Sequence, residues 1–139
     1  MNREELKQLM IGDLVYVKAY RLDDNFQRVE FKKPVRIAEI GNIVTVEDPV
    51  NDKEPYLICE STDIEPVRLT PEILEKNGFV CKGAWMIEGE DMGLRQLGDN
   101  WGLLPYYADY NGDCFCIISF VHDLQHALRL CGIDKNIEL

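Results

Sequence analysis

β-Branched and aromatic residues cluster in short runs over the first half of the chain, which is typical of β-strands. Such runs occur at 14–17, 34–40 and 56–60, and apolar and polar residues alternate strictly at 43–48. A proline confines a further short strand at 63–67 to a sheet edge. Several short strands joined by tight turns predict a small antiparallel barrel of the SH3 type, because closure leaves no strand edge exposed.

The second half of the chain opens with a helix signal. Thr70 supplies a hydroxyl cap, and the proline after it suits the first helical position. Asn77 and Gly78 are residue types that tolerate left-handed backbone and end helices. We therefore expect a helix at 71–77, at the junction of two domains.

Strands and a second helix are expected after this junction. The pattern predicts strands within 79–87 and at 114–118, with a turn-rich segment between them whose strand limits it does not define. Ser119 is expected to cap a helix that Gly132 ends. A last short strand is expected at 136–139, where apolar and polar residues alternate.

These elements predict an α+β fold in two parts. Residues 1–69 are expected to form the N-terminal SH3-like β-barrel, with a short helix before it. Residues 70–139 are expected to form an α+β unit, a small antiparallel sheet with a packed C-terminal helix and a short C-terminal strand. The pattern does not decide whether the two parts pack as one domain.

Composition supports a globular intracellular protein. The chain has 139 residues, 46% hydrophobic and 29% charged, which is too apolar for disorder. No apolar run approaches the roughly 18 residues of a membrane helix, and the acidic, polar start does not resemble a secretory signal. We therefore expect a cytoplasmic location and no membrane contact.

The net charge of −10 opposes nucleic acid as a partner, because it repels phosphate at long range. Basic residues gather in the first 40 positions, which hold eight basic and seven acidic side chains. The stretch 28–36 predicts a solvated strand pair, and it is also where a nucleic-acid contact through the barrel would lie. The cations of that alternative are Arg28, Lys32, Lys33 and Arg36.

The cysteines point to a core role rather than to disulfides. They number five, stand in apolar surroundings and accompany no secretory signal. We expect buried, reduced thiols at Cys59, Cys81, Cys114, Cys116 and Cys131.

The two histidines, His122 and His126, are four residues apart on the predicted last helix, with Asp123 between them. Two imidazoles one turn apart beside a carboxylate imitate a zinc protease, so a divalent-metal hydrolase is one alternative. Spacing indicates no third ligand, and we expect no cofactor. On a helical wheel the histidines form a stripe with Gln125 and Arg129 opposite the apolar face, which favours contact with solvent or a partner.

An aromatic-rich segment lies among glycines and acids and consists of Trp101, Tyr106, Tyr107 and Tyr110. Exposed aromatics in a loop are good recognition material, whereas buried ones belong to the core, and both interpretations stay open. Together with His122, His126 and Arg129, these residues are the candidate binding residues.

Three segments occur in a familiar order. They are residues 9–15, then residues 64–74 closing with Asn77-Gly78-Phe79, and finally Val121-His122-Asp123-Leu124-Gln125 leading to Ile137-Glu138-Leu139. Together they resemble a family of small prophage-like proteins from gut-bacterial genomes, whose pattern reads IGxxV, LTxExL, GF and VHxLQ. The resemblance implies a shared α+β layout and an intracellular, mobile-element setting. It implies no catalytic residue, because no activity is established for that family.

The sequence favours recognition over catalysis. It contains no phosphate-cradling glycine loop, nucleophile elbow or catalytic triad. We therefore favour a non-enzymatic interaction module that binds a protein partner or a second copy of itself. Metal-dependent hydrolysis and nucleic-acid contact are the alternatives.

Overall fold

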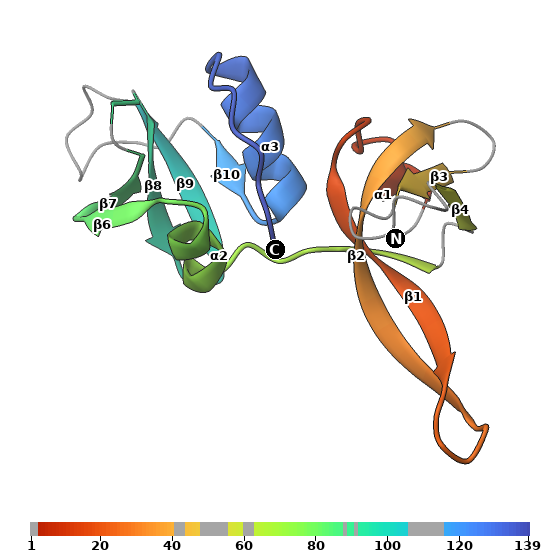
Figure 1. Cartoon of the computed structure of the whole chain (residues 1–139). Helices are drawn as coiled ribbons and strands as arrows, with labels where there is room; N and C mark the ends of the chain where they lie inside the picture. Colours follow the sequence, from red (N-terminus) through yellow and green to blue (C-terminus); the bar gives the residue numbers. More distant parts are fainter. Residues whose placement is uncertain are drawn as a thin grey trace. The chain divides into compact units, whose positions relative to one another are not determined.

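The computed structural model describes residues 3–40, 44–47, 56–59, 63–87, 89–90, 92–105 and 116–139. The chain divides into two compact units, Met1–Val67 and Arg68–Leu139, called unit 1 and unit 2 below. Within the described residues, each unit contains one five-stranded antiparallel sheet and at least one helix (Figure 1). The predicted α+β class is therefore confirmed.

Unit 1 begins with a short helix and continues as strands. Its elements are α1 (Arg3–Leu6), β1 (Leu14–Leu22), β2 (Arg28–Ile40), β3 (Val44–Glu47), β4 (Tyr56–Cys59) and β5 (Ile64–Pro66). The strand order is β4-β3-β2-β1-β5, and all the pairings are antiparallel. No pairing among these described strands joins β4 to β5, so the structure does not confirm the predicted SH3-like closure.

The core of unit 1 follows the alternation of its strands. The inward positions include Val15, Val35, Ile37 and Val46, and all four are buried. The turn before β1 depends on Gly12, whose φ of 91° favours glycine and whose N–H donates to the Ile37 carbonyl at 2.7 Å. This turn holds the start of β1 against β2.

The strands β1 and β2 are longer than the sequence pattern indicates. β5 pairs with β1 only at Val15–Val17, and β3 pairs with β2 only over Arg36–Ile40. Beyond these contacts, in the described part of the chain, β1 and β2 pair only with each other and extend as a two-stranded hairpin (Figure 1). We call residues 18–33 the arm. Its second strand confirms the strand pair predicted at 28–36.

Unit 2 is an antiparallel meander between two helices. Its elements are α2 (Pro71–Lys76), β6 (Val80–Lys82), β7 (Ala84–Met86), β8 (Met92–Leu97), β9 (Asn100–Pro105), β10 (Ile117–Ile118) and α3 (Val121–Leu130). The strand order is β10-β9-β8-β7-β6, so each strand pairs with its neighbour in sequence. β10 is therefore at the edge of the sheet among the described strands, and α3 follows it directly.

The predicted first helix of unit 2 is confirmed as α2. Its start is capped by Thr70, whose Oγ1 accepts a hydrogen bond from the N–H of Ile73 at 3.3 Å. At its end, the side-chain amide of Asn77 donates to the carbonyl of Glu138 at 2.7 Å and accepts from the N–H of Glu138 at 2.8 Å. The prediction of a strand at 136–139 is wrong. The backbone N–H and carbonyl of Glu138 bond to the side chain of Asn77 instead of to a neighbouring strand.

The predicted C-terminal helix is confirmed as α3, but its cap differs from the expectation. The Oδ2 of Asp123 accepts hydrogen bonds from the N–H groups of Ser119 at 3.0 Å and Phe120 at 2.9 Å. Ser119 is therefore not the cap, and its hydroxyl lies 2.9 Å from Oδ1 of Asn100 instead. Gly132 ends the helix with a φ of 70°, as predicted. None of the helices described here is long and apolar enough to span a membrane.

Candidate binding groove

Trp101 does not lie in an exposed recognition loop. It is part of β9 and is 1% exposed, and its Nε1–H donates to the carbonyl of Leu69 at 3.1 Å. Its ring meets Trp85 edge-on at 6.4 Å. Its predicted binding role therefore lacks the exposure on which it depended. The tyrosines of the same predicted segment, Tyr106, Tyr107 and Tyr110, lie outside the described residues.

The predicted polar stripe of α3 is wrong over the first half of the helix. His122 is 2% exposed and lies under the ring of Phe120, at 5.5 Å and nearly parallel. Gln125 is buried and His126 is half-buried, whereas Arg129 is exposed. The helical wheel missed this burial because the covering ring belongs to Phe120, which precedes the helix.

The histidine pair does not form a metal centre with Asp123. The imidazole rings of His122 and His126 are 5.8 Å apart, and Nε2 of His122 is 3.5 Å from Oδ1 of Asp123. The other oxygen of that carboxylate caps α3. Among the residues that the structure describes, no three of His, Cys, Asp and Glu are placed to hold a metal ion. The hydrolase alternative therefore lacks a ligand set in this part of the chain.

The basic residues proposed for nucleic-acid contact all lie on β2. Strand alternation places Arg28, Lys32 and Arg36 on one face and Lys33 on the other. An ion pair joins Nζ of Lys32 to Oε2 of Glu65 at 2.6 Å. This hydrogen bond raises the pKa of Lys32 and lowers the pKa of Glu65. The face carries both signs of charge, so it does not form a phosphate-binding surface of one sign.

The expectation of buried thiols is wrong for the three cysteines whose side chains are described. Cys81, Cys116 and Cys131 are exposed and form no disulfide. Cys116 precedes the edge strand β10, and Cys131 follows the last turn of α3. Edge strands and helix ends leave a small side chain open to solvent, which local apolar sequence does not reveal. The side chains of Cys59 and Cys114 lie outside the description.

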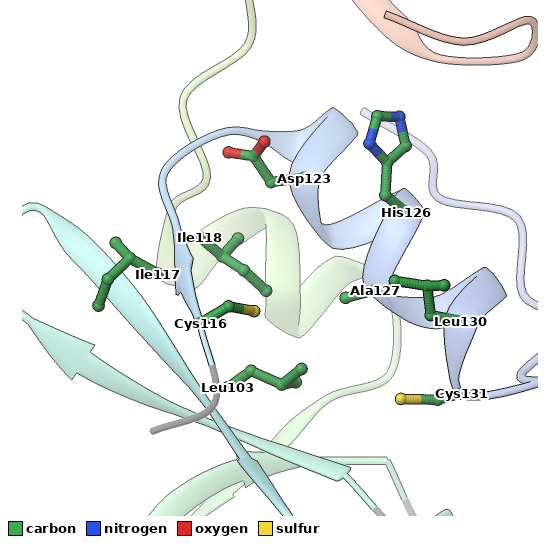
Figure 2. Close-up of a pocket in the computed structure, with 9 residues that line it drawn as sticks. All are labelled: Leu103, Cys116, Ile117, Ile118, Asp123, His126, Ala127, Leu130 and Cys131. Atoms are coloured by element: carbon green, nitrogen blue, oxygen red, sulfur yellow. The ribbon is translucent and has the colours of Figure 1, made fainter. Parts of the chain in front are cut away.

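Two of these thiols line a groove between the edge of the unit 2 sheet and α3. The groove has a volume of about 210 Å³. Its lining residues are Leu103, Cys116, Ile117, Ile118, Asp123, His126, Ala127, Leu130 and Cys131. Figure 2 shows the side chains from β9 and β10 on one wall and those from α3 on the other. Apart from its polar end at Asp123 and His126, the groove is apolar.

The rim of the groove is an exposed apolar surface. Ile117 is 57% exposed and Leu130 is 89% exposed, although large apolar side chains gain by burial. A cavity of about 150 Å³ already accepts a benzene molecule, whereas cofactor and drug sites usually hold about 300–1,000 Å³. The groove therefore matches one aromatic or branched side chain.

The groove was not predicted from the sequence, although Leu130 carried a signal. This leucine lies beside His126 on the helix surface, outside the apolar stripe that predicted the buried face of α3. An apolar residue on a polar face marks a second contact surface. The other wall depends on the pairing of β10 with β9, which no local pattern defines.

No family model, curated protein or solved structure matches this chain. The resemblance to prophage-like proteins therefore stays a prediction, and the groove is interpreted from its own geometry.

Proposed function

We propose that the chain is a non-enzymatic interaction module that binds one apolar side chain of a protein partner in the groove of unit 2. The observation that supports this function is an apolar groove whose rim residues, Ile117 and Leu130, are left exposed. Exposed apolar surface around a concavity is typical of a protein-binding site.

The size of the groove limits what a single side chain contributes. Burying one large apolar side chain contributes about 1.5–3 kcal/mol, which is less than the free energy of millimolar binding. A partner must therefore add contacts around the rim. Asp123 and His126 supply polar groups there, at one end of the groove.

A small probe tests the groove separately from any natural partner. N-acetyl-phenylalaninamide at tens of millimolar, the range in which one buried side chain of about 1.5–3 kcal/mol binds, is expected to shift the backbone amide resonances of Leu103, Ile118 and Ala127. N-acetyl-alaninamide is the matched control ligand, because it has the same backbone and no ring. Absence of these shifts, or equal shifts with both ligands, would contradict the proposed function.

A rim variant locates the binding. Leu130→Ser removes an exposed side chain, so the fold is retained while the apolar contact with the probe is lost. Leu97→Ser is the control, since Leu97 is also exposed and does not line the groove. The probe is expected to protect the Cys131 thiol from alkylation in the control variant and to lose this protection with Leu130→Ser.

We also propose that unit 1 is a small barrel of the SH3 type. The support is its strand order, in which β5 returns to β1 and the meander β2-β3-β4 continues on the other side. A register shift between Ile37 and Glu39 bends β2, as a β-bulge does in curved sheets. Nuclear Overhauser effects between β4 and β5 would establish the closure, and their absence would refute it.

A further inference from the structure

The arm ends in an exposed aromatic ring on a well-ordered turn. The Oδ1 of Asp23 accepts hydrogen bonds from the N–H groups of Asn25 at 2.9 Å and Gln27 at 2.8 Å. The N–H of Phe26 donates to the carbonyl of Asp23 at 3.0 Å. Phe26 has a φ of 57°, which bulky residues rarely adopt, and its side chain is 83% exposed. The turn therefore presents a phenyl ring to solvent from a hydrogen-bonded backbone.

The arm carries this ring away from the sheet of unit 1. From Lys18 to Leu22 the two strands have no third partner in the described residues. Five residues of extended strand span about 17 Å. Phe26 is thus positioned to reach into another molecule.

The two most exposed large apolar side chains of the described residues are Phe26 on the arm and Leu130 on the groove rim. Phe26 is a projecting ring, whereas Leu130 borders a concavity of about 210 Å³. This volume exceeds the roughly 150 Å³ that accommodates a benzene molecule. The arm and the groove are complementary in shape and polarity.

Charge favours the same pairing. Arg129 is exposed and lies one turn after His126 on the helix surface, next to a residue that lines the groove. Asp23 and Asp24 accompany Phe26 on the tip of the arm and are exposed. The tip carboxylates and Arg129 therefore carry opposite signs, whereas Asp123 in the groove lining has the same sign as the tip.

The whole arm also differs from the remainder of the chain in its balance of charge. Residues 18–33 contain five basic and three acidic side chains, whereas the rest contains ten basic and 22 acidic ones. A positive arm is attracted to an acidic body, which favours encounter between copies.

We propose that the groove of unit 2 binds Phe26 from the arm of a second copy of this chain. The inference rests on the proposed function, because it identifies the apolar side chain that the groove takes. In this contact the phenyl ring lies between α3 and β10, and the tip carboxylates face Arg129.

Sedimentation equilibrium of the full chain, from micromolar to near-millimolar concentration, tests the contact. The wild-type chain is expected to self-associate. Phe26→Ser and Leu130→Ser are each expected to weaken association by about tenfold or more, as loss of an apolar anchor does. Val80→Ser is the control, since Val80 is exposed on β6 and outside both surfaces. Thermal unfolding checks that every variant is folded.

Mixing the two variants gives the sharpest result. The Leu130→Ser chain keeps its arm and the Phe26→Ser chain keeps its groove, so an equimolar mixture is expected to form a 1:1 dimer more tightly than either variant associates alone. A monomeric wild-type chain, or equal association of wild type and Phe26→Ser, would overturn the inference. The N-acetyl-phenylalaninamide titration separates the two proposals, because a groove that binds this probe while Phe26→Ser changes nothing leaves the proposed function standing.

Discussion

Trp101 and Phe26 are both aromatic residues next to hairpin turns, and the structure treats them in opposite ways. Trp101 follows the turn between β8 and β9 and is 1% exposed. Phe26 lies in the turn between β1 and β2 and is 83% exposed. The two rings differ in exposure because other residues cover only one of them.

Trp101 is covered by residues from other parts of unit 2. Trp85 of β7 meets its ring edge-on at 6.4 Å, and its indole N–H donates to the carbonyl of Leu69 at 3.1 Å. Phe26 ends a ribbon of two strands with no third strand in the described residues. Exposure of an aromatic residue therefore depends on long-range pairing, which the local sequence does not contain. A buried ring stabilises its unit, whereas an exposed ring is available for recognition.

Replacing the buried ring is the strongest way to test this comparison. Trp101→Ala is expected to lower the free energy of unfolding of unit 2 by about 3–5 kcal/mol, because it leaves a cavity and an unpaired carbonyl at Leu69. Urea unfolding followed by circular dichroism measures the loss.

The matched variant removes the exposed ring. Phe26→Ala is expected to change the free energy of unfolding by no more than about 0.5 kcal/mol, as surface substitutions do. Equal losses for the Trp101 and Phe26 variants would show that burial does not distinguish the two rings in stability.

The parts of the fold that the sequence predicted correctly are those with local signals. The cap at Thr70 and the stop at Gly78 lie within one helix, so α2 was predicted within about a residue. The β-branched run at 34–40 and the alternation at 43–48 likewise predicted β2 and β3. The outer half of the arm was missed in β1, because residues 18–22 have no alternating apolar pattern.

The candidate site was predicted poorly because its exposure depends on residues from different elements. The wheel of α3 placed His122 at the surface, but the ring of Phe120 covers it, and Arg68 lies 5.2 Å above that ring. Cys116 was expected in the core, yet it lines a groove at the sheet edge. A single helix or strand cannot show what its neighbours cover.

A smaller effect concerns the hydrogen bonds that hold the backbone of the exposed arm tip. Asp23→Ala removes the acceptor of the N–H groups of Asn25 and Gln27, worth about 1 kcal/mol for local hydrogen bonds. Amide hydrogen exchange at Gln27 is expected to accelerate about fivefold, while global stability stays unchanged. Asp24→Ala is the control, because this neighbouring carboxylate is also exposed. Equal exchange in both variants would mean that the side chain of Asp23 does not order the tip.

The smallest effect concerns the ion pair that ties the base of the arm to β5. The hydrogen bond from Lys32 lowers the pKa of Glu65 below its ordinary value of 4.5, so the pair stabilises the fold above about pH 4.5. This stabilisation is lost as the pH falls through the lowered pKa. The same bond raises the pKa of Lys32 above 10.5, so the alkaline loss begins only beyond that value.

Glu65→Gln is therefore expected to lower the urea midpoint slightly near neutral pH and to match the wild-type chain in strong acid. The effect is small because both side chains are partly exposed and solvent screens the pair. The same substitution is expected to accelerate amide exchange in the arm next to Lys32 and to leave unit 2 unchanged. A midpoint difference between wild type and Glu65→Gln that persists in strong acid, well below the lowered pKa of Glu65, would assign the effect to lost packing instead of charge, and the arm would then depend on packing against β5.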